Sequence, residues 1–273
     1  MTDHYLLGHS TEEYERLRRQ ARMWEPDTVR LFDQVELGEG DRCLDAGCGP
    51  GEAMRLMAER VGPAGEVVGI DADTAIGRQA VEELRIAGQA QCRFEPWDAE
   101  ADAKIPGAPF DLVYARLLLT HVTNPAAVLG RLWGWVAPGG HLVVQDYDLP
   151  SSAVVPELDS AEEFYRLTTG VFREAGRDVR VGLRLPALHV EVGIGPPDGM
   201  ETAARCAPLA ELAWIYEAVY RSMLPAAVGS GLTTEVDAER WFESFARDSA
   251  ADRGHVALWP LLVGTWKRKS AQT

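Results

Sequence analysis

Basic side chains are scarce in this sequence, and lysine occurs only at Lys104, Lys267 and Lys269. The 27 lysine and arginine residues face 42 aspartate and glutamate residues, which gives a formal net charge of −15 at pH 7. A nucleic-acid groove needs a basic stripe to replace phosphate counterions, and an anionic membrane surface attracts basic segments. The charge balance therefore predicts that neither nucleic acid nor a membrane is a partner of this chain.

Long apolar runs are also absent. The longest nearly uncharged apolar stretches cover residues 117–122 and 256–263, far fewer than the roughly 20 residues that a membrane-spanning helix needs. Residues 1–9 show no cationic start followed by an apolar core, so they do not resemble a secretory signal. We expect a cytoplasmic protein.

Cysteine is rare, and the four residues of this type are Cys43, Cys48, Cys92 and Cys206. They form no Cys-x-x-Cys pair and have no histidine cluster near them in the sequence, so their spacing disfavours a zinc site. Reduced thiols are the default state for a cytoplasmic chain. We expect free thiols and no bound metal.

The rest of the composition is that of a folded globular protein, with 46% hydrophobic and 25% charged residues in a chain of 273. Short buried strands alternate with amphipathic helices over the first half, a pattern typical of βαβ units and of a parallel sheet covered on both faces. We therefore predict a doubly wound α/β fold. The expected strands are residues 42–46, 66–70, 90–95, 110–114 and 141–146, and the expected helices are residues 10–36 with a break at Pro26, 52–61, 74–87 and 124–136.

The pattern changes after residue 148. Helical segments dominate the region 151–253, which we interpret as helices packed over the sheet. Pro260 interrupts the last apolar segment, so we expect the strand there to lie at a sheet edge or to carry a bulge. The expected helices are residues 160–175, 184–192, 208–224 and 235–250, and the expected strands are residues 200–206 and 255–267.

The most informative segment is residues 44–51, which read Leu-Asp-Ala-Gly-Cys-Gly-Pro-Gly between a strand and a helix. Glycine permits positive φ and lets a ligand approach the backbone, and the following helix N-terminus offers free amides. Asp71 lies at the end of the next strand, where a carboxylate can accept hydrogen bonds from two ribose hydroxyls. A tight turn without a ligand is the alternative interpretation.

Two ligand classes use such a turn. A dinucleotide site has the pattern G-x-G-x-x-G, but the position of the third glycine is Glu52, and a carboxylate there is a poor neighbour for a pyrophosphate. Asp45 precedes the turn and suits a ligand that carries a cationic amine. An NAD-dependent oxidoreductase therefore remains the weaker alternative.

These residues resemble the first motif of the Rossmann-fold (class I) S-adenosylmethionine-dependent methyltransferases. Asp71 matches the ribose-binding acid of that family, and Trp97-Asp98 matches the position that binds the adenine. Residues 110–116 and 132–141 resemble the segments around strands four and five. The resemblance is strong over residues 40–148 and weak elsewhere.

The resemblance implies a seven-stranded, mostly parallel sheet whose final strand is antiparallel. It also implies one methyltransferase domain, 1–273, with an N-terminal helical lid (1–36), a cofactor-binding core (37–150), a helical substrate cover (151–253) and the final strand (254–273). S-adenosyl-L-methionine is the implied cofactor. The implied cofactor-binding residues are Tyr14, Gln20, Asp45, Gly47, Cys48, Gly49, Gly51, Asp71, Ala72, Trp97, Asp98, Ala115 and Arg116.

Several of these residues also have a plainer interpretation. Tyr14 and Gln20 lie six positions apart, so both face the cofactor only if the helix bends, and helix packing is the alternative. Asp45 can cap its own loop, and Trp97 can be a core residue. Arg116 can face the substrate or form a surface ion pair.

The catalytic candidates are His121 and Asp146. His121 follows strand four, where the resemblance places methyl transfer, and a histidine with an ordinary pKa near 6.5 can accept a proton from a hydroxyl or an amine. Asp146 and Asp148 end strand five, where carboxylates orient a polar acceptor or merely cap the strand. Helix packing is the alternative for His121.

We therefore expect methyl transfer to an O, N or C atom of a small-molecule acceptor, with O slightly favoured and a metabolite or natural product as the leading class. A non-catalytic S-adenosylmethionine-binding protein, or one that catalyses another reaction such as a cyclisation, are alternatives on the same fold. A homodimer is left open.

Overall fold

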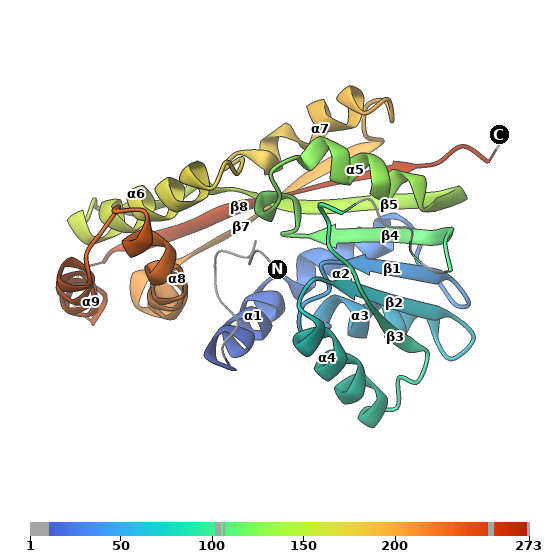
Figure 1. The fold of residues 1–273 in the computed structure, drawn as a ribbon, viewed down its shortest axis with the longest axis horizontal. Helices are drawn as coiled ribbons and strands as arrows, with labels where there is room; N and C mark the ends of the chain where they lie inside the picture. The colour runs from blue at the N-terminus through green and yellow to red at the C-terminus, as the bar shows by residue number, and fades with distance from the viewer. Residues whose placement is uncertain (1–10, 102–104, 106, 251–253, 272–273) are drawn as a thin grey trace.

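The computed structural model describes residues 11–101, 105, 107–250 and 254–271. Five parallel strands form one half of its sheet, in the order β3-β2-β1-β4-β5 (Figure 1). This order is that of a doubly wound sheet, and it confirms the predicted α/β class. The strands are β1 (Arg42–Ala46), β2 (Glu66–Asp71), β3 (Cys92–Pro96), β4 (Phe110–Arg116) and β5 (Val136–Asp148).

The other half of the sheet is antiparallel. β8 (Val256–Arg268) pairs with β5 along one edge and with β7 (Gly199–Pro208) along the other. The three-residue strand β6 (Ala153–Val155) pairs with the beginning of β8. The sheet thus has eight strands where seven were expected, because β6 is too short to give a sequence signal.

Pro260 lies inside β8, at an irregular point on both of its edges. On one edge, pairing with β5 ends at Leu261 and pairing with β6 resumes at Leu258. On the other edge, the register of β7 shifts between Ala203 and Arg205, opposite the same region. Because proline has no N–H to give to the ladder, the predicted irregularity is confirmed, but the strand is central and not at the sheet edge.

Helices cover both faces of the parallel half. α2 and α3 contribute to one buried apolar cluster together with the end of α4, and α5 and α7 contribute to another. Each helix buries one apolar stripe against the strands, which is how amphipathic helices gain most of their stability in a folded protein. The bounds are α2 (Glu25–Gln34), α3 (Glu52–Val61), α4 (Thr74–Ile86), α5 (Pro125–Gly134) and α7 (Val181–Glu191).

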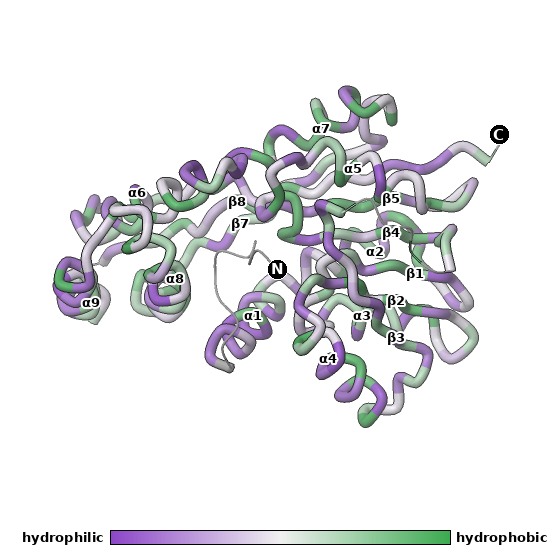
Figure 2. The backbone as a smooth tube through the Cα atoms, in the orientation of Figure 1, coloured by the Kyte–Doolittle hydropathy of each residue, from purple (hydrophilic) through white to green (hydrophobic). Residues whose placement is uncertain are grey.

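A third buried cluster, rich in aromatic rings, lies beyond the parallel strands. It joins β8 to α6 (Asp159–Glu174), α8 (Leu209–Gly229) and α9 (Glu235–Ala250), which Figure 1 shows at the far end of the long strands β7 and β8. Figure 2 shows both hydrophilic and hydrophobic stretches in each of these helices, as expected for helices with one buried face. We call α6, α8 and α9 the cover helices.

The first helix, α1 (Thr11–Met23), lies between the cover helices and α4 in Figure 1. The expected break before Pro26 is confirmed, because α1 ends at Met23 and α2 begins at Glu25 with proline in its first turn. The expected first residue of this helix, residue 10, lies outside the described residues. β5 begins at residue 136 and not at 141, since Val136 already pairs with Phe110.

None of the described helices is long and apolar enough to cross a membrane. All four cysteines are free thiols. Among the residues that the structure describes, no group of three or more His, Cys, Asp or Glu side chains is placed to hold a metal ion.

Candidate active site

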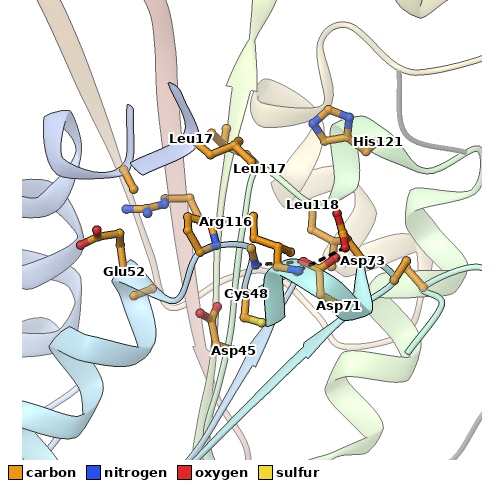
Figure 3. Close-up of a pocket in the computed structure, with 18 of the residues that line it drawn as sticks. Leu17, Asp45, Cys48, Glu52, Asp71, Asp73, Arg116, Leu117, Leu118 and His121 are labelled. Atoms are coloured by element: carbon orange, nitrogen blue, oxygen red, sulfur yellow. Dashed lines mark hydrogen bonds between the residues drawn. The ribbon is translucent and has the colours of Figure 1, made fainter. Parts of the chain in front are cut away.

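A cavity of about 230 Å³ opens at the carboxyl ends of β1, β2 and β4, beneath α1 (Figure 3). Its wall contains most of the residues singled out from the sequence. The fold therefore brings segments that are far apart in the chain around one space. These residues are Tyr14, Gln20, Asp45, Gly47, Cys48, Gly49, Asp71, Ala72, Trp97, Asp98, Arg116 and His121. Gly51, Ala115 and Asp146 are not in the wall.

The glycine turn forms one side of this cavity. Gly49 has φ +47°, and a Cβ atom added there would meet no atom within 4 Å. Gly47 has φ +73°, and a Cβ there would lie 3.2 Å from Leu118. The positive φ values explain why the turn uses glycine, and the open space over Gly49 is where a ligand can approach the backbone.

Gly51 serves packing and not the cavity. It has φ +78°, and an added Cβ would lie only 2.9 Å from the Cβ of Ala80 on α4. The glycine therefore lets α3 begin close to α4. This is a different reason for glycine from the cofactor contact expected at this position.

Asp71, at the end of β2, stabilises the glycine turn through a hydrogen bond. Its carboxylate accepts a 2.9 Å hydrogen bond from the Gly49 amide and another of 2.9 Å from the Asp73 amide. The carboxylate is thus fixed in orientation at the cavity wall, close to the open space over Gly49. A carboxylate has about four lone-pair sites, so it retains capacity to accept ribose hydroxyls.

Asp45 lies at the base of the cavity on β1 and is 2% exposed. Burial raises the pKa of its carboxyl to about 7, with Arg116 opposing that rise and Asp71 adding to it. Its Oδ2 atom has no hydrogen-bond partner among the described residues. A buried carboxylate oxygen without a partner is costly unless a ligand cation or donor satisfies it.

Arg116 supplies a positive charge to the same wall. Its guanidinium donates a 2.8 Å hydrogen bond to the hydroxyl of Thr28, which is bonded in turn to Tyr114 and Gln145. This buried network fixes the direction of the arginine. Figure 3 shows Arg116 and Asp45 on neighbouring strands beneath α1, so one carboxylate and one guanidinium are available to a ligand with an ammonium and a carboxylate group.

Trp97, Asp98 and Ala72 form the wall on the β2–β3 side. Trp97 is buried and packs edge-on against Trp135, at 5.3 Å between ring centroids. Its indole Nε1 has no hydrogen-bond partner among the described residues, so a ligand ring there gains an apolar wall and a donor. Cys48 is a buried thiol whose pKa burial raises well above the usual range, which disfavours it as a nucleophile.

α1 closes the cavity from above, and its two candidate residues differ in their contacts. The Tyr14 hydroxyl donates a 2.6 Å hydrogen bond to Asp73, the residue that caps α4. Gln20 donates a 3.0 Å hydrogen bond to the hydroxyl of Tyr147 on β5. Both side chains line the cavity although they lie six positions apart.

The family model for the methyltransferase domain matches residues 14–180, which is more than half of the chain. The chain belongs to the class I S-adenosylmethionine-dependent methyltransferases. The match covers most of α1, the whole parallel half of the sheet, and α6. It therefore contains every residue that lines the cavity just described.

Relatives and solved structures agree with this assignment. Over 130 residues the chain is 35% identical to the trans-aconitate 2-methyltransferase of Azoarcus sp. (strain BH72), a match that covers 46% of this chain and 48% of that one. The chain thus spans about half the length of the curated relatives it matches. A Bacillus halodurans C-125 crystal structure assigned as a methyltransferase has a TM-score of 0.59, 17% identity and coverage of 90% of this chain and 99% of that one.

Another solved structure is a Haemonchus contortus phosphoethanolamine N-methyltransferase in complex with phosphomonomethylethanolamine and S-adenosylhomocysteine. It has a TM-score of 0.53 and 14% identity, and the match covers 90% of this chain and 52% of that one. At such identities the likeness concerns the fold alone. A match over 90% of this chain nevertheless extends beyond residues 14–180 of the family match.

A second cavity, of about 60 Å³, adjoins the first. Gln20, Leu117 and His121 line both cavities, so only these side chains and their neighbours separate the two spaces. The rest of its wall comes from α1, the turn after β4, the end of β5 and the segment that follows it, and from β8, α6 and α8. These further wall residues are Arg16, Thr120, Tyr147, Leu149, Ser152, Phe164, Tyr165, Thr168, Thr169, Phe172, Val219, Trp259 and Pro260.

His121 lies at the junction of the two cavities, on the opposite side of Figure 3 from Asp45. The residue as a whole is half-buried, and its ring lies 5.6 Å from the ring of Phe172. Burial, followed by the positive charges of Arg16 and Arg177, lowers the pKa of the imidazole to about 3. The position fits the expectation for a catalytic residue, but the low pKa makes His121 a weak base.

Asp146 and Asp148 do not face either cavity. The Asp146 carboxylate is fully buried and accepts hydrogen bonds from the amides of Thr120, at 3.1 Å, and Tyr147, at 2.8 Å. Asp148 pairs with Arg180 at 3.0 Å. Asp146 therefore holds the turn that carries His121, and its expected role as a base has no support in this geometry. Ala115 is buried within β4.

Several wall residues gave no usable sequence signal. Leu117 lines both cavities with φ +56°, a conformation that a leucine adopts at a cost and that nothing in its sequence neighbourhood predicts. Trp24 and Tyr147 meet only through the tertiary fold. Asp73 was not singled out from the sequence because the neighbouring Asp71 already matched the ribose-binding position. Its place directly before a helical segment is nevertheless typical of a helix cap.

Proposed function

We propose that this methyltransferase transfers a methyl group from S-adenosylmethionine to a small-molecule acceptor that binds in the second cavity. One observation carries the proposal: the larger cavity, lined by the glycine turn and Asp71, shares three wall residues with a separate, smaller cavity at the end of β5. A two-substrate transfer needs two adjoining sites, and shared wall residues place these two cavities next to each other. An NAD-dependent oxidoreductase is disfavoured because Glu52 lines the cavity at the N-terminus of α3, where a pyrophosphate would sit.

The larger cavity fits the cofactor of this family. The partnerless Oδ2 atom of Asp45 suits its ammonium group, and the fixed guanidinium of Arg116 suits its carboxylate. Asp71 is placed for the ribose, and Trp97 with Asp98 for the adenine. When bound, S-adenosylmethionine supplies an electrophilic methyl group on a sulfonium.

The protein's own contribution is orientation and exclusion of water. α1 covers the cofactor cavity, while α6, α8 and β8 contribute to the wall of the second cavity. Side chains that hold two reactants in contact can supply several kcal/mol of the barrier reduction without chemistry of their own. His121 and Leu117, on both walls, are placed to orient the acceptor atom toward the cofactor.

Two measurements test this function. Calorimetric titration should detect binding of S-adenosylmethionine and S-adenosylhomocysteine, and no binding of NAD. Incubation of the purified protein with methyl-labelled cofactor and a metabolite extract should yield a labelled small molecule. Tight cofactor binding without any labelled product would instead favour a binding protein on the same fold.

A further inference from the structure

The second cavity has an asymmetric set of polar groups in its wall. Arg16 is the single charged side chain among the described wall residues, and no aspartate or glutamate lines the space. Arg16 forms an ion pair with Glu13, whose carboxylate also accepts from Ser222 on α8 and is not part of the wall. Of this buried ion pair, only the cationic residue, Arg16, lines the cavity, and the anionic residue, Glu13, does not.

Tyr147 adds a donor beside this arginine. Its hydroxyl oxygen accepts hydrogen bonds from the indoles of Trp24, at 2.6 Å, and Trp259, at 3.1 Å, and from the Gln20 amide, at 3.0 Å. Indole N–H groups can only donate. The Gln20 amide is also fixed, since Arg16 donates to its oxygen and so turns its NH₂ group toward Tyr147.

The consequence is that the Tyr147 hydroxyl can only donate to a further group. A phenol oxygen has two lone pairs, and three N–H groups already compete for them. Donors that point at one hydroxyl polarise it and strengthen the bond that its own proton makes. Because Tyr147, Gln20 and Trp259 all line the second cavity, this polarised O–H lies at the cavity wall.

Two threonine hydroxyls are also unsatisfied in this wall. Thr120 is 3% exposed and Thr168 is 7% exposed, and the Oγ1 atom of each has no hydrogen-bond partner among the described residues. By contrast, the hydroxyls of Thr169 and Ser152 donate to backbone carbonyl oxygens at 2.7 and 2.8 Å. Buried hydroxyls without partners are rare in folded proteins, and a polar ligand would satisfy both.

The remaining surface of the cavity is apolar and rich in aromatic rings. Phe164, Tyr165, Phe172 and Trp259 lie in the wall, together with Leu149 and Val219. Such rings favour a planar or otherwise apolar ligand body. A ligand with several charges would leave some of them unpaired against this surface.

We propose that the second cavity binds a small monocarboxylate with an apolar or aromatic body as the methyl acceptor. The carboxylate accepts hydrogen bonds from Arg16 and Tyr147, and the orphan hydroxyls of Thr120 and Thr168 complete its polar contacts. Because Glu13 already pairs with Arg16, the ligand carboxylate is a second anionic partner of this arginine, and the described wall has no further cation for the other two carboxylates of trans-aconitate. One carboxylate oxygen forms a bond to the methyl carbon while the methyl–sulfur bond of S-adenosylmethionine breaks, so the products are a methyl ester and S-adenosylhomocysteine. The low pKa of His121 agrees with this class, because a carboxylate is already ionised and no proton has to be removed. This inference rests on the proposed function.

The test uses isosteric variants that leave the fold intact. Thr168→Val and Thr120→Val each remove an unsatisfied buried hydroxyl, so the thermal unfolding temperature of the free protein should stay equal or rise. Thr233→Val is the matched control, since Thr233 is also a buried threonine but lines neither cavity. Tyr147→Phe is less suitable, because it would leave three buried N–H donors unpaired.

Binding is measured by calorimetry on the full chain saturated with S-adenosylhomocysteine. The probes are crotonate and benzoate, with benzamide, benzylamine and trans-aconitate as comparisons. We expect at least one monocarboxylate to bind, benzoate at least tenfold more tightly than benzamide and benzylamine, and both monocarboxylates more tightly than trans-aconitate. Thr168→Val and Thr120→Val should each weaken binding of the monocarboxylates at least fivefold, and Thr233→Val less than twofold.

Three results would overturn the inference: no binding by either monocarboxylate, tighter binding of benzylamine, or unchanged affinity in both cavity variants. The titration with S-adenosylhomocysteine that precedes each experiment distinguishes a protein that does not bind the cofactor from one that binds it but prefers another class of acceptor. Failure to bind S-adenosylhomocysteine contradicts the proposed function itself. Normal binding without a preference for carboxylates contradicts only the acceptor class.

Discussion

The hydroxyl of Tyr14 donates a 2.6 Å hydrogen bond to Asp73, and so connects the first helix to the cap of α4 across the mouth of the cofactor cavity. Asp73 at the same time accepts from the amides of Ala75 and Ile76. The contact therefore ends on a side chain that the fold already holds in place.

Removing this contact should speed release of the cofactor. Burial, with smaller contributions from Asp73 and Asp71, raises the pKa of Tyr14 to about 12, so the bond persists across the physiological range. We expect Tyr14→Phe to raise the dissociation rate of S-adenosylhomocysteine roughly tenfold, the value of a charge-assisted hydrogen bond of about 1.4 kcal/mol. Stopped-flow fluorescence would measure the rate.

The control for Tyr14→Phe is Arg18→Ala. Arg18 pairs with Glu83 at 2.6 Å and also connects α1 to α4, but this pair is exposed, and exposed pairs contribute little. A rate change below twofold is expected for Arg18→Ala. Equal effects of the two variants would mean that α1 is held by its general position and not by the tyrosine.

Affinity for the cofactor should depend on pH through Asp45. Its pKa of about 7 is raised by burial, and the ammonium group of the ligand binds the ionised form. The dissociation constant should therefore rise by up to tenfold for each pH unit below about 7. Calorimetry between pH 5.5 and pH 8 would reveal this slope, which Asp45→Asn should abolish.

The same variant should stabilise the free protein. Burial raises the folded-state pKa of Asp45 from its ordinary value of 3.8 to about 7, so the folded protein favours the protonated carboxyl. The free energy of unfolding therefore falls as the pH rises from 3.8 to about 7, where the folded state also loses this proton. At pH 8 the folded state bears the cost of the ionised carboxylate, with an upper limit of about 4 kcal/mol for three pKa units. Asp45→Asn should thus resist urea better at pH 8 while binding the cofactor more weakly. Lower stability together with unchanged affinity would contradict both expectations.

Two glycines of the same turn should respond differently to alanine. At Gly49 the new Cβ enters open space, so we expect a loss of roughly 1 kcal/mol from the positive φ and at least a tenfold weaker affinity for S-adenosylhomocysteine. At Gly51 the Cβ would lie 2.9 Å from Ala80, so the main effect should be a loss of about 2–4 kcal/mol in the free energy of unfolding. Urea unfolding and calorimetry on both variants measure the contrast, and a reversed pattern would place the ligand elsewhere.

His121 should contribute position more than proton transfer. A pKa of about 3 means that the imidazole is neutral above about pH 4, so titration of His121 should leave no limb near pH 6.5 in the turnover profile. We expect His121→Ala to lower turnover about tenfold on the acceptor identified from the extract, below the 10²–10⁴-fold of a positioned base. Cofactor affinity should change less than turnover. A larger loss, with a wild-type limb near pH 6.5 that the variant lacks, would restore His121 as the base.

The sequence predicted which residues gather around the larger cavity because local chemistry determines their positions. The glycine turn, Asp71 and Trp97-Asp98 each follow a strand, and the carboxyl ends of parallel strands meet at one edge of the sheet. The parallel strand order and the irregularity at Pro260 have equally local causes.

The wall of the second cavity could not be predicted, because side chains that are far apart in the sequence form it. Tyr147 meets Trp24 and Trp259 across separations of 123 and 112 residues, and no pattern near Tyr147 indicates either partner. The positive φ of Leu117 is imposed by its surroundings, since leucine has no intrinsic preference for it. Asp146 looked catalytic from its place at a strand end, but the buried amides of Thr120 and Tyr147 use its carboxylate.

The pairing of β8 with β5 limits how the chain can be shortened. A protein that ended at residue 180, where the family match ends, would keep the whole wall of the cofactor cavity. It would also expose the hydrogen-bonding edge of β5 from His141 to Asp148, which β8 covers in the complete fold. An open edge on an apolar central strand is a template for intermolecular pairing. The C-terminal strand thus covers an edge that would otherwise be open to pairing with another chain, although none of its residues lines the larger cavity.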